Sequence, residues 1–331
     1  MQRFVTDFDT NYAAKGIAML ESLLEYSPEA QIIVVCYDET LRGILEDRFK
    51  TRLELIPQKT VENWEPRLAP LRERRQPWEF YATHKAILLK HLLSRCADGE
   101  AIAFIDADTL FFSDPEPLFQ EFEAASIGVS PHRYNKDTEY LRMYGEFNAG
   151  FGLWRKDSTG RQCLEEWTEQ CLDWCQLEAT EDGRFMNQGY LTTWPERYQR
   201  VRILRHPGAN LAPWNIGSHR IEFLSKGKGV SVDGLPLIFF HYSSLLHSDG
   251  HRWHTFCPKK ALQQNVVLEG IYAPYLKTLE RISLQLKKRY GVSGLETLRE
   301  FQPDNGGMMD ISASIRRARS PWKRFVKRLL P

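Results

Sequence analysis

The chain has 331 residues, of which 42% are hydrophobic and 26% are charged, and its formal net charge is +1. These values are typical of a soluble globular protein and exclude a chain that binds polyanions over its whole surface. Residues 1–7 contain no apolar run like that of a signal peptide, and no stretch approaches the ~18 consecutive apolar residues of a spanning helix. We therefore expect a cytoplasmic protein.

Strands and helices alternate in the first part of the chain. Residues 3–5 form a short apolar strand, residues 14–26 a helix with one apolar face, residues 31–37 a buried strand and residues 39–49 a second helix. This alternation predicts an α/β fold with a mainly parallel sheet and helices on both faces. Residues 57–79 are rich in Pro, Arg and Glu and have weak periodicity, so we expect a loop or insertion there.

The same pattern continues to about residue 275 and then changes. Apolar residues recur at helical spacing after this point, before a basic tail. We therefore expect one domain at residues 1–275 and a C-terminal helical extension at residues 276–331. The further elements expected in the first domain are strands at residues 101–105, 125–130, 150–154 and 237–241 and helices at residues 79–94 and 159–177.

An acidic pair, Asp106 and Asp108, directly follows the clearest strand of the chain, residues 101–105. Open α/β sheets bind ligands at the carboxyl edge of their strands. Two adjacent carboxylates at that edge favour a hard divalent cation such as Mg²⁺ or Mn²⁺, which commonly shares its ligands with substrate phosphates. The alternative is that both acids cap a turn. Asp7 and Asp9 have the same spacing, so Asp-x-Asp alone is a weak signal. The prediction of a metal site therefore depends on the apolar strand that precedes Asp106.

A phosphatase of the haloacid dehalogenase type would use a similar pattern, Asp-x-Asp-x-Thr after a strand. Here Thr109 directly follows the second Asp, and Leu110 stands where the Thr should be. The mismatch leaves a phosphatase or another phosphotransfer enzyme as the alternative function.

Five segments, in order along residues 1–275, together resemble glycosyltransferases of the GT-A fold, particularly bacterial relatives of family 8. The segments are residues 104–115 with the acidic pair, Phe-Asn-Ala-Gly-Phe at 147–151, Asn-Gln-Gly-Tyr-Leu at 187–191, residues 206–215, and Phe-Phe-His-Tyr at 239–242. The resemblance implies a Rossmann-like fold with a mainly parallel mixed sheet. It also implies transfer of a sugar from a nucleotide diphosphate donor.

The resemblance assigns a metal and diphosphate site. Asp106, Asp108 and His241 would hold Mn²⁺ or Mg²⁺ against both phosphates, and the cation would stabilise the charge of the departing nucleoside diphosphate. Lys85 could direct a second positive charge at the diphosphate, or it could be a solvated helix residue. From the residues alone, a His at the end of an apolar strand, such as His241, is more often a core residue, and the resemblance reverses this preference.

The first turn, which contains Thr6, Asp9 and Tyr12, resembles the nucleotide-base site of the family. Asp9 could accept a hydrogen bond from a uracil N–H, and Tyr12 could stack on the ring, so a UDP-sugar is the favoured donor. The alternative is turn chemistry, because Asp and Asn favour such positions.

The donor sugar would contact Asn148, Ala149, Gly150 and Gln188 in the family's arrangement. Asn187 stands where the family usually has Asp, and this removes a carboxylate next to Gln188 from the expected catalytic residues. The substitution leaves the donor sugar open. It also keeps a catalytically silent nucleotide-sugar-binding protein as an alternative.

The sequence departs from the family again after His241, where the usual glycine and lysine ending is absent. In its place, His247, His251 and His254 could imitate a zinc site, although phosphate contact by His251 or Arg252, or an exposed loop, is favoured. Three cysteines within a predicted helix are expected to be buried side chains rather than a metal cluster. These cysteines are Cys163, Cys171 and Cys175.

The tail, residues 315–331, contains seven Lys or Arg residues and no acid. Its apolar positions predict an amphipathic basic helix, which suits an anionic membrane surface at ~1 kcal/mol per basic residue and disfavours nucleic acid. A docked or disordered terminus is the alternative. We therefore expect transfer of a sugar to a glycan or lipid-linked acceptor, in surface polysaccharide synthesis, by an enzyme peripheral to the inner face of the membrane.

Overall fold

The structure is a computed structural model that describes residues 2–224, 229–248, 252–295, 297–298 and 308–312. The predicted basic tail at residues 315–331 and His251 lie outside the described residues. The chain divides into two units. Unit 1 contains Met1–Asp9, Ser27–Asp106 and Pro115–Arg205, and unit 2 contains Thr10–Tyr26, Ala107–Asp114 and the residues from His206 on.

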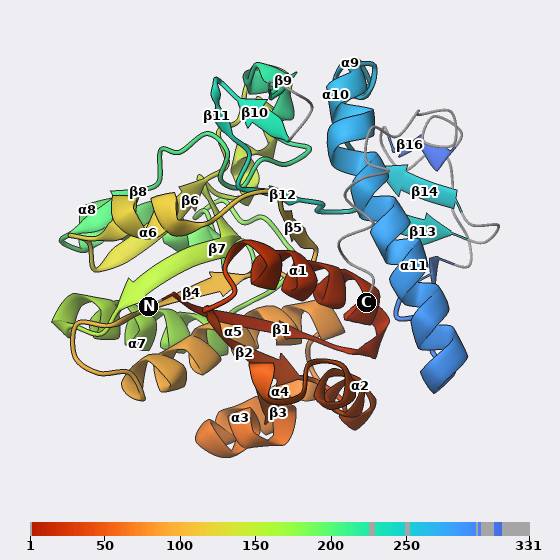
Figure 1. Ribbon diagram of the computed structural model, residues 1–331. Coiled ribbons are helices and arrows are strands. Elements are labelled where there is room, and N and C mark those ends of the chain that lie inside the picture. The colour runs from red at the N-terminus through yellow and green to blue at the C-terminus, as the bar shows by residue number, and fades with distance from the viewer. Residues whose placement is uncertain (1, 225–228, 249–251, 296, 299–307, 313–331) are drawn as a thin grey trace. The chain divides into compact units, whose positions relative to one another are not determined.

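Unit 1 is built on a seven-stranded sheet with the order β3-β2-β1-β4-β7-β6-β8 (Figure 1). Every neighbouring pair is parallel except the two pairs that β7 makes with β4 and β6. Strands buried on both faces are continuously apolar, which accounts for the run Ile32–Val35 in β2. The strands are β1 Arg3–Phe8, β2 Gln31–Cys36, β3 Leu53–Pro57, β4 Ala101–Ile105, β6 Ile127–Pro131, β7 Phe147–Arg155 and β8 Val201–Ile203.

Helices of unit 1 cover both faces of this sheet. Val5 and Phe104 point to one face, where they join a buried cluster with side chains of α5 and α7. Phe4 points to the opposite face and meets Phe119 of α6 edge-on, with ring centroids 5.5 Å apart. The predicted α/β class is therefore confirmed. The helices are α2 Glu39–Phe49, α3 Gln58–Trp64, α4 Ala69–Arg72, α5 Pro77–Ser94, α6 Glu116–Phe122, α7 Ser158–Asp173 and α8 Trp194–Arg197.

The loop expected at residues 57–79 is wrong in part, because α3 and α4 lie there. Both helices are too short to show a periodic apolar pattern, and α3 buries only Val61. The prolines of this region are compatible with helix, because Pro66 and Pro70 stand at the beginning of helical segments, where the missing N–H costs nothing.

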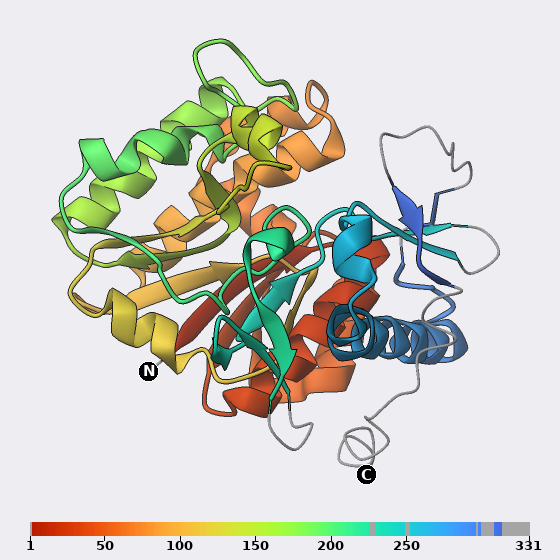
Figure 2. The same cartoon turned by 90° about the horizontal axis from the view of Figure 1, so that it is seen from above.

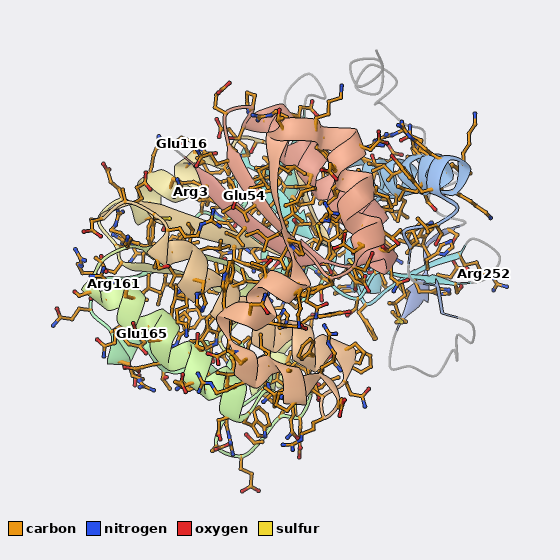
Figure 3. All side chains as sticks on the ribbon, turned by 90° about the horizontal axis from the view of Figure 1, so that it is seen from below. Arg3, Glu54, Glu116, Arg161, Glu165 and Arg252 are labelled. Carbon is orange, nitrogen blue, oxygen red and sulfur yellow. The ribbon has the colours of Figure 1, made fainter. Side chains whose placement is uncertain are left out.

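Helix α7 separates charged and apolar residues clearly. Arg161 and Glu165 project from its outer side (Figure 3), whereas Cys163 and Trp167 are buried. All six cysteines of the chain are buried and free, as expected for the three in and after α7.

Unit 2 contains α1 Ala13–Tyr26, a pair of antiparallel strands and two smaller sheets (Figure 2). Strand β5, Thr109–Phe111, pairs with β12, Phe239–His241. The long helix α11, Ala273–Tyr290, packs against α1 and ends at Gly291, which adopts the left-handed conformation common at helix ends. The other elements are η1 Thr10–Tyr12, β9 Ile221–Phe223, β10 Val230–Val232, β11 Leu235–Pro236, β13 Leu246–Ser248, β14 Arg252–Thr255, β15 Thr297–Leu298, β16 Met309–Asp310, α9 Lys259–Leu262 and α10 Asn265–Val267.

Helix α11 confirms a helical C-terminal part. The predicted domain boundary between residues 275 and 276 falls within this helix and stays a prediction. Among the helices that the structure describes, none combines the length and the hydropathy needed to cross a bilayer.

Candidate functional site

Asp106 directly follows β4 and forms an ion pair with Lys85 of α5. The Lys85 ammonium donates to Asp106 Oδ1 at 2.8 Å and to the Ala149 carbonyl at 3.0 Å. It also lies 4.1 Å from the centroid of the Phe104 ring, and the residue is only 7% exposed. The alternative of a solvated Lys85 is therefore wrong. A buried cation lies beside the first carboxylate of the acidic pair.

Asp7 on β1 is a second titratable group of this region. Burial raises the pKa of Asp7 to about 6, although the nearby Lys85 and a 2.5 Å hydrogen bond from Tyr37 oppose the rise. The sequence did not single out Asp7 as a site residue. An acid inside an otherwise apolar strand is the signal that could have identified it.

The predicted nucleotide-base residues are divided between the units. Thr6 on β1 is fully buried, and its hydroxyl has no hydrogen-bond partner among the described residues. Asp9 follows β1 in the same unit and acts electrostatically on Tyr37 and Tyr81, whose rings stack at 4.1 Å. Tyr12 belongs to unit 2, where it ends the short helix η1.

The predicted donor-sugar residues Asn148, Ala149, Gly150 and Gln188 form one connected group in unit 1. Gln188 Oε1 accepts from Asn148 Nδ2 at 3.4 Å and from the Ala149 N–H at 3.5 Å. Asn148 Oδ1 accepts from the Gly150 N–H at 3.0 Å. On its other side, Gln188 Nε2 donates to the Tyr144 carbonyl at 2.9 Å.

Strand β7 carries three of these residues beside an irregularity of the sheet. The register of β7 against β6 shifts between Val129 and Ser130, and Asn148 pairs with Ser130 just past the shift. Such bulges redirect side chains and are common next to functional sites.

The Asn187 side chain does not belong to this group, because it is directed toward α5. Its Nδ2 donates to the Ala82 carbonyl of α5 at 2.9 Å, and its own carbonyl accepts from the Trp167 indole N–H at 2.8 Å. The residue is 5% exposed. An ionised Asp could not donate to Ala82, so the local structure accounts for Asn where the family usually has Asp.

Asp108 and His241 meet in unit 2 because β5 and β12 pair. Thr109 lies opposite His241, and the Asp108 carbonyl accepts from the Tyr242 N–H at 2.8 Å. Asp108 Oδ1 is then 3.1 Å from His241 Nε2. Burial acts to raise the pKa of Asp108, but His241 and Lys15 outweigh it and lower this pKa to about 2. The carboxylate is thus ionised over the physiological range.

The second ring nitrogen of His241 faces an amide. Nδ1 lies 3.3 Å from Asn210 Oδ1, and the Trp214 ring approaches the imidazole edge-on at 5.2 Å. A metal ligand at Nε2 would have to replace the proton that this nitrogen shares with Asp108, and a hydrogen bond from Nδ1–H to Asn210 would support that neutral form, as is usual for ligating histidines. Asn210 was not predicted as a site residue, although it lies in one of the resembling segments.

Asp106 completes a group of three possible metal ligands. It precedes Asp108 by two residues, and one ligand atom from each of Asp106, Asp108 and His241 lies within 4.8 Å of the others. No other such group occurs among the described residues. Two carboxylates and a neutral imidazole fit a divalent cation that prefers oxygen and tolerates nitrogen, such as Mn²⁺.

The zinc site considered at residues 247–254 has no such support in the described part of the chain. His254 bonds to Ser248 Oγ at 2.9 Å, and the His247 ring packs against Trp253 with centroids 4.8 Å apart. Arg252 is exposed on β14 (Figure 3), and its contact with phosphate stays a prediction.

Lys15 is the clearest residue of this site that sequence reasoning missed. It is buried in the first turn of α1, and its charge acts on Asp108. A lysine within the run Ala13-Ala14-Lys15-Gly16-Ile17-Ala18, on the apolar side of a helix, was the available signal.

Comparison with known proteins identifies the family. Residues 30–265 match the family model described as nucleotide-diphospho-sugar transferase. Two proteins of Bacillus subtilis (strain 168), both described as uncharacterized, are similar to the chain. YfnF is 33% identical over 236 residues, which are 69% of this chain and 77% of YfnF. YfnD is 28% identical over 280 residues, which are 84% of this chain and 88% of YfnD.

Among solved structures, the galactosyltransferase LgtC in complex with donor and acceptor sugar analogues is similar to this chain. It is 16% identical, with a TM-score of 0.47 over 73% of this chain and 87% of LgtC. The family model carries the assignment because it matches more than half of the chain. The predicted resemblance to nucleotide-sugar glycosyltransferases is confirmed at this level, and its narrower part, family 8, stays a prediction. The chain belongs to the nucleotide-diphospho-sugar transferase family.

Proposed function

We propose that the protein transfers a sugar from a UDP-sugar to a glycan or lipid-linked acceptor, with Mn²⁺ or Mg²⁺ held by Asp106, Asp108 and His241. The observation that carries the proposal is the group of three ligands within 4.8 Å in a member of this family. The bound cation would neutralise charge that develops on the departing diphosphate.

Residues of the chain would add to this stabilisation and orient the donor. The Lys85 ammonium, 2.8 Å from Asp106, brings a further positive charge to the diphosphate. The hydrogen bonds that Gln188 Oε1 accepts, at 3.4 and 3.5 Å, are long and weak, so this oxygen can exchange them for a sugar hydroxyl. Asn187 has a positioning role, because its amide holds the Gln188 segment against α5.

Nucleotide recognition would fall to the first turn of the chain. Asp9 would accept a hydrogen bond from the base, and Tyr12 would stack on it. The acceptor would be an intermediate of surface polysaccharide synthesis. Residues 315–331 would bring the protein to the membrane.

The test is a thermal-shift screen of UDP, GDP, ADP and CDP with and without Mn²⁺, followed by measurement of UDP release from UDP-sugars. We expect stabilisation by UDP that depends on Mn²⁺ and is lost in Asp106→Asn and Asp108→Asn. If none of the four nucleotides stabilised the protein in either condition, the proposal would be wrong. Stabilisation without release of UDP, with acceptor glycans present, would instead identify a silent binding protein.

A further inference from the structure

Lys15 is a buried cation of unit 2 that makes no direct ion pair with a carboxylate among the described residues, although its charge acts on Asp108. It lies in the first turn of α1 and is 4% exposed. Its ammonium donates one hydrogen bond, to the Leu245 carbonyl at 3.1 Å, and lies 4.2 Å from the centroid of the Tyr12 ring. Among the described residues, no carboxylate lies within ion-pair distance of this ammonium.

This environment satisfies the hydrogen-bonding capacity of the Lys15 ammonium only in part. A lysine ammonium has three N–H donors, and only one of them meets an acceptor among the residues that the structure describes. A neutral carbonyl and an aromatic face attract a cation, but they replace its lost hydration only in part. Buried charges are normally paired at close range, so an ammonium that touches no carboxylate at this depth is suited to an anionic ligand.

The position of Lys15 connects it to the metal ligands of the same unit. Its acceptor, Leu245, follows His241 by four residues, and the intervening chain turns tightly, because the Leu245 N–H donates to the Tyr242 carbonyl at 3.0 Å. The Tyr242 N–H in turn donates to the Asp108 carbonyl at 2.8 Å. Lys15 is therefore bonded to the turn that continues the strand of His241, next to Asp108.

We propose that Lys15 is a diphosphate-binding residue, whose two remaining N–H groups donate to phosphate oxygens of the nucleotide-sugar donor. The inference rests on the proposed function, because the diphosphate is the anion that a cation on Asp108 and His241 would bring to this place. It adds a donor that no resemblance assigned.

The experiment compares Lys15→Met with Lys15→Arg and with a matched control, Lys277→Met on the exposed side of α11. Thermal-shift titrations in Mn²⁺ give the apparent affinities for UDP and for uridine. We expect Lys15→Met to weaken UDP binding at least tenfold and to leave uridine binding unchanged. Lys15→Arg should retain most of the UDP affinity, and Lys277→Met should behave like the wild type.

Three outcomes separate the explanations. If the wild type binds UDP and Lys15→Met binds it equally well, the inference is overturned. Equal losses of UDP and uridine affinity would show that Lys15 only supports the fold, and this would also overturn it. If Lys15→Met does not fold, a tenfold loss of UDP affinity in Lys15→Gln with unchanged uridine binding decides the question in the same way. A wild type that binds no nucleotide diphosphate contradicts the proposed function itself.

Discussion

Replacing Asn187 by Asp is expected to destabilise the protein by about 2–4 kcal/mol at neutral pH. The substitution preserves shape, but it exchanges the N–H₂ group that donates to the Ala82 carbonyl at 2.9 Å for a carboxylate oxygen. Loss of the hydrogen bond accounts for about 1 kcal/mol, and the unpaired buried carboxylate facing a carbonyl accounts for about 1–3 kcal/mol more. The site is 5% exposed, so water cannot restore the lost partner.

The effect should depend on pH with a definite sign. The protonated carboxyl can donate to Ala82, so folding favours this form and raises the pKa of the new Asp above its unfolded value of ~3.9. The destabilisation is then small below this value and grows as the pH rises through the raised pKa. Urea unfolding at pH 7.5 and pH 4.5 measures both quantities.

Asn265→Asp, at an exposed position of α10, is the matched control and should change the free energy of unfolding by less than ~0.5 kcal/mol. A variant Asn187→Asp as stable as the wild type at pH 7.5 would refute the reasoning. It would show that donation to Ala82 is not the reason for Asn at this position.

Other predictions concern buried titratable groups and the tail. Asp7→Asn should stabilise the protein by up to about 3 kcal/mol at pH 7.5 and have little effect at pH 4. The pKa of Asp7 is about 6, so the wild type loses stability as the pH rises from about 4 through 6. Equal urea midpoints of variant and wild type at pH 7.5 would contradict this. His84→Phe should reduce the loss of stability on acidification. Burial lowers the pKa of His84 to about 3, so each pH unit between about 6.5 and 3 costs the wild type ~1.4 kcal/mol. If the free energy of unfolding fell equally from pH 7 to pH 5 in variant and wild type, His84 would not be the cause of that loss. Deleting residues 315–331 should abolish cosedimentation with anionic liposomes, and undiminished binding would show that the tail is not the membrane contact.

Much of the sheet could be predicted from local pattern. The strand expected at residues 101–105 coincides with β4, because five apolar residues between polar ones leave little choice. The strand expected at 150–154 is the second half of β7, which begins at Phe147. The first half of β7 could not be recognised from the sequence because of Asn148. A polar side chain in a buried strand interrupts the apolar pattern from which strands are predicted.

The acidic pair of the candidate metal site could be proposed from the sequence, whereas Lys15 could not. Asp106 and Asp108 are neighbours in the chain, so a single strand positions both. The Lys15 ammonium donates to the carbonyl of Leu245, 230 residues away, and no local sequence pattern predicts such a contact. A lysine in a helix is usually solvated, so burial had to be observed.

One turn of α5 has a mechanical consequence for the enzyme. The Ala82 carbonyl holds the Asn187 side chain, His84 packs in the core against Phe80, and Lys85 bonds to Asp106. Four consecutive residues of a helix move as a rigid piece. Engagement of Lys85 by an anion would therefore be transmitted as strain or stiffening to the segment that carries Gln188.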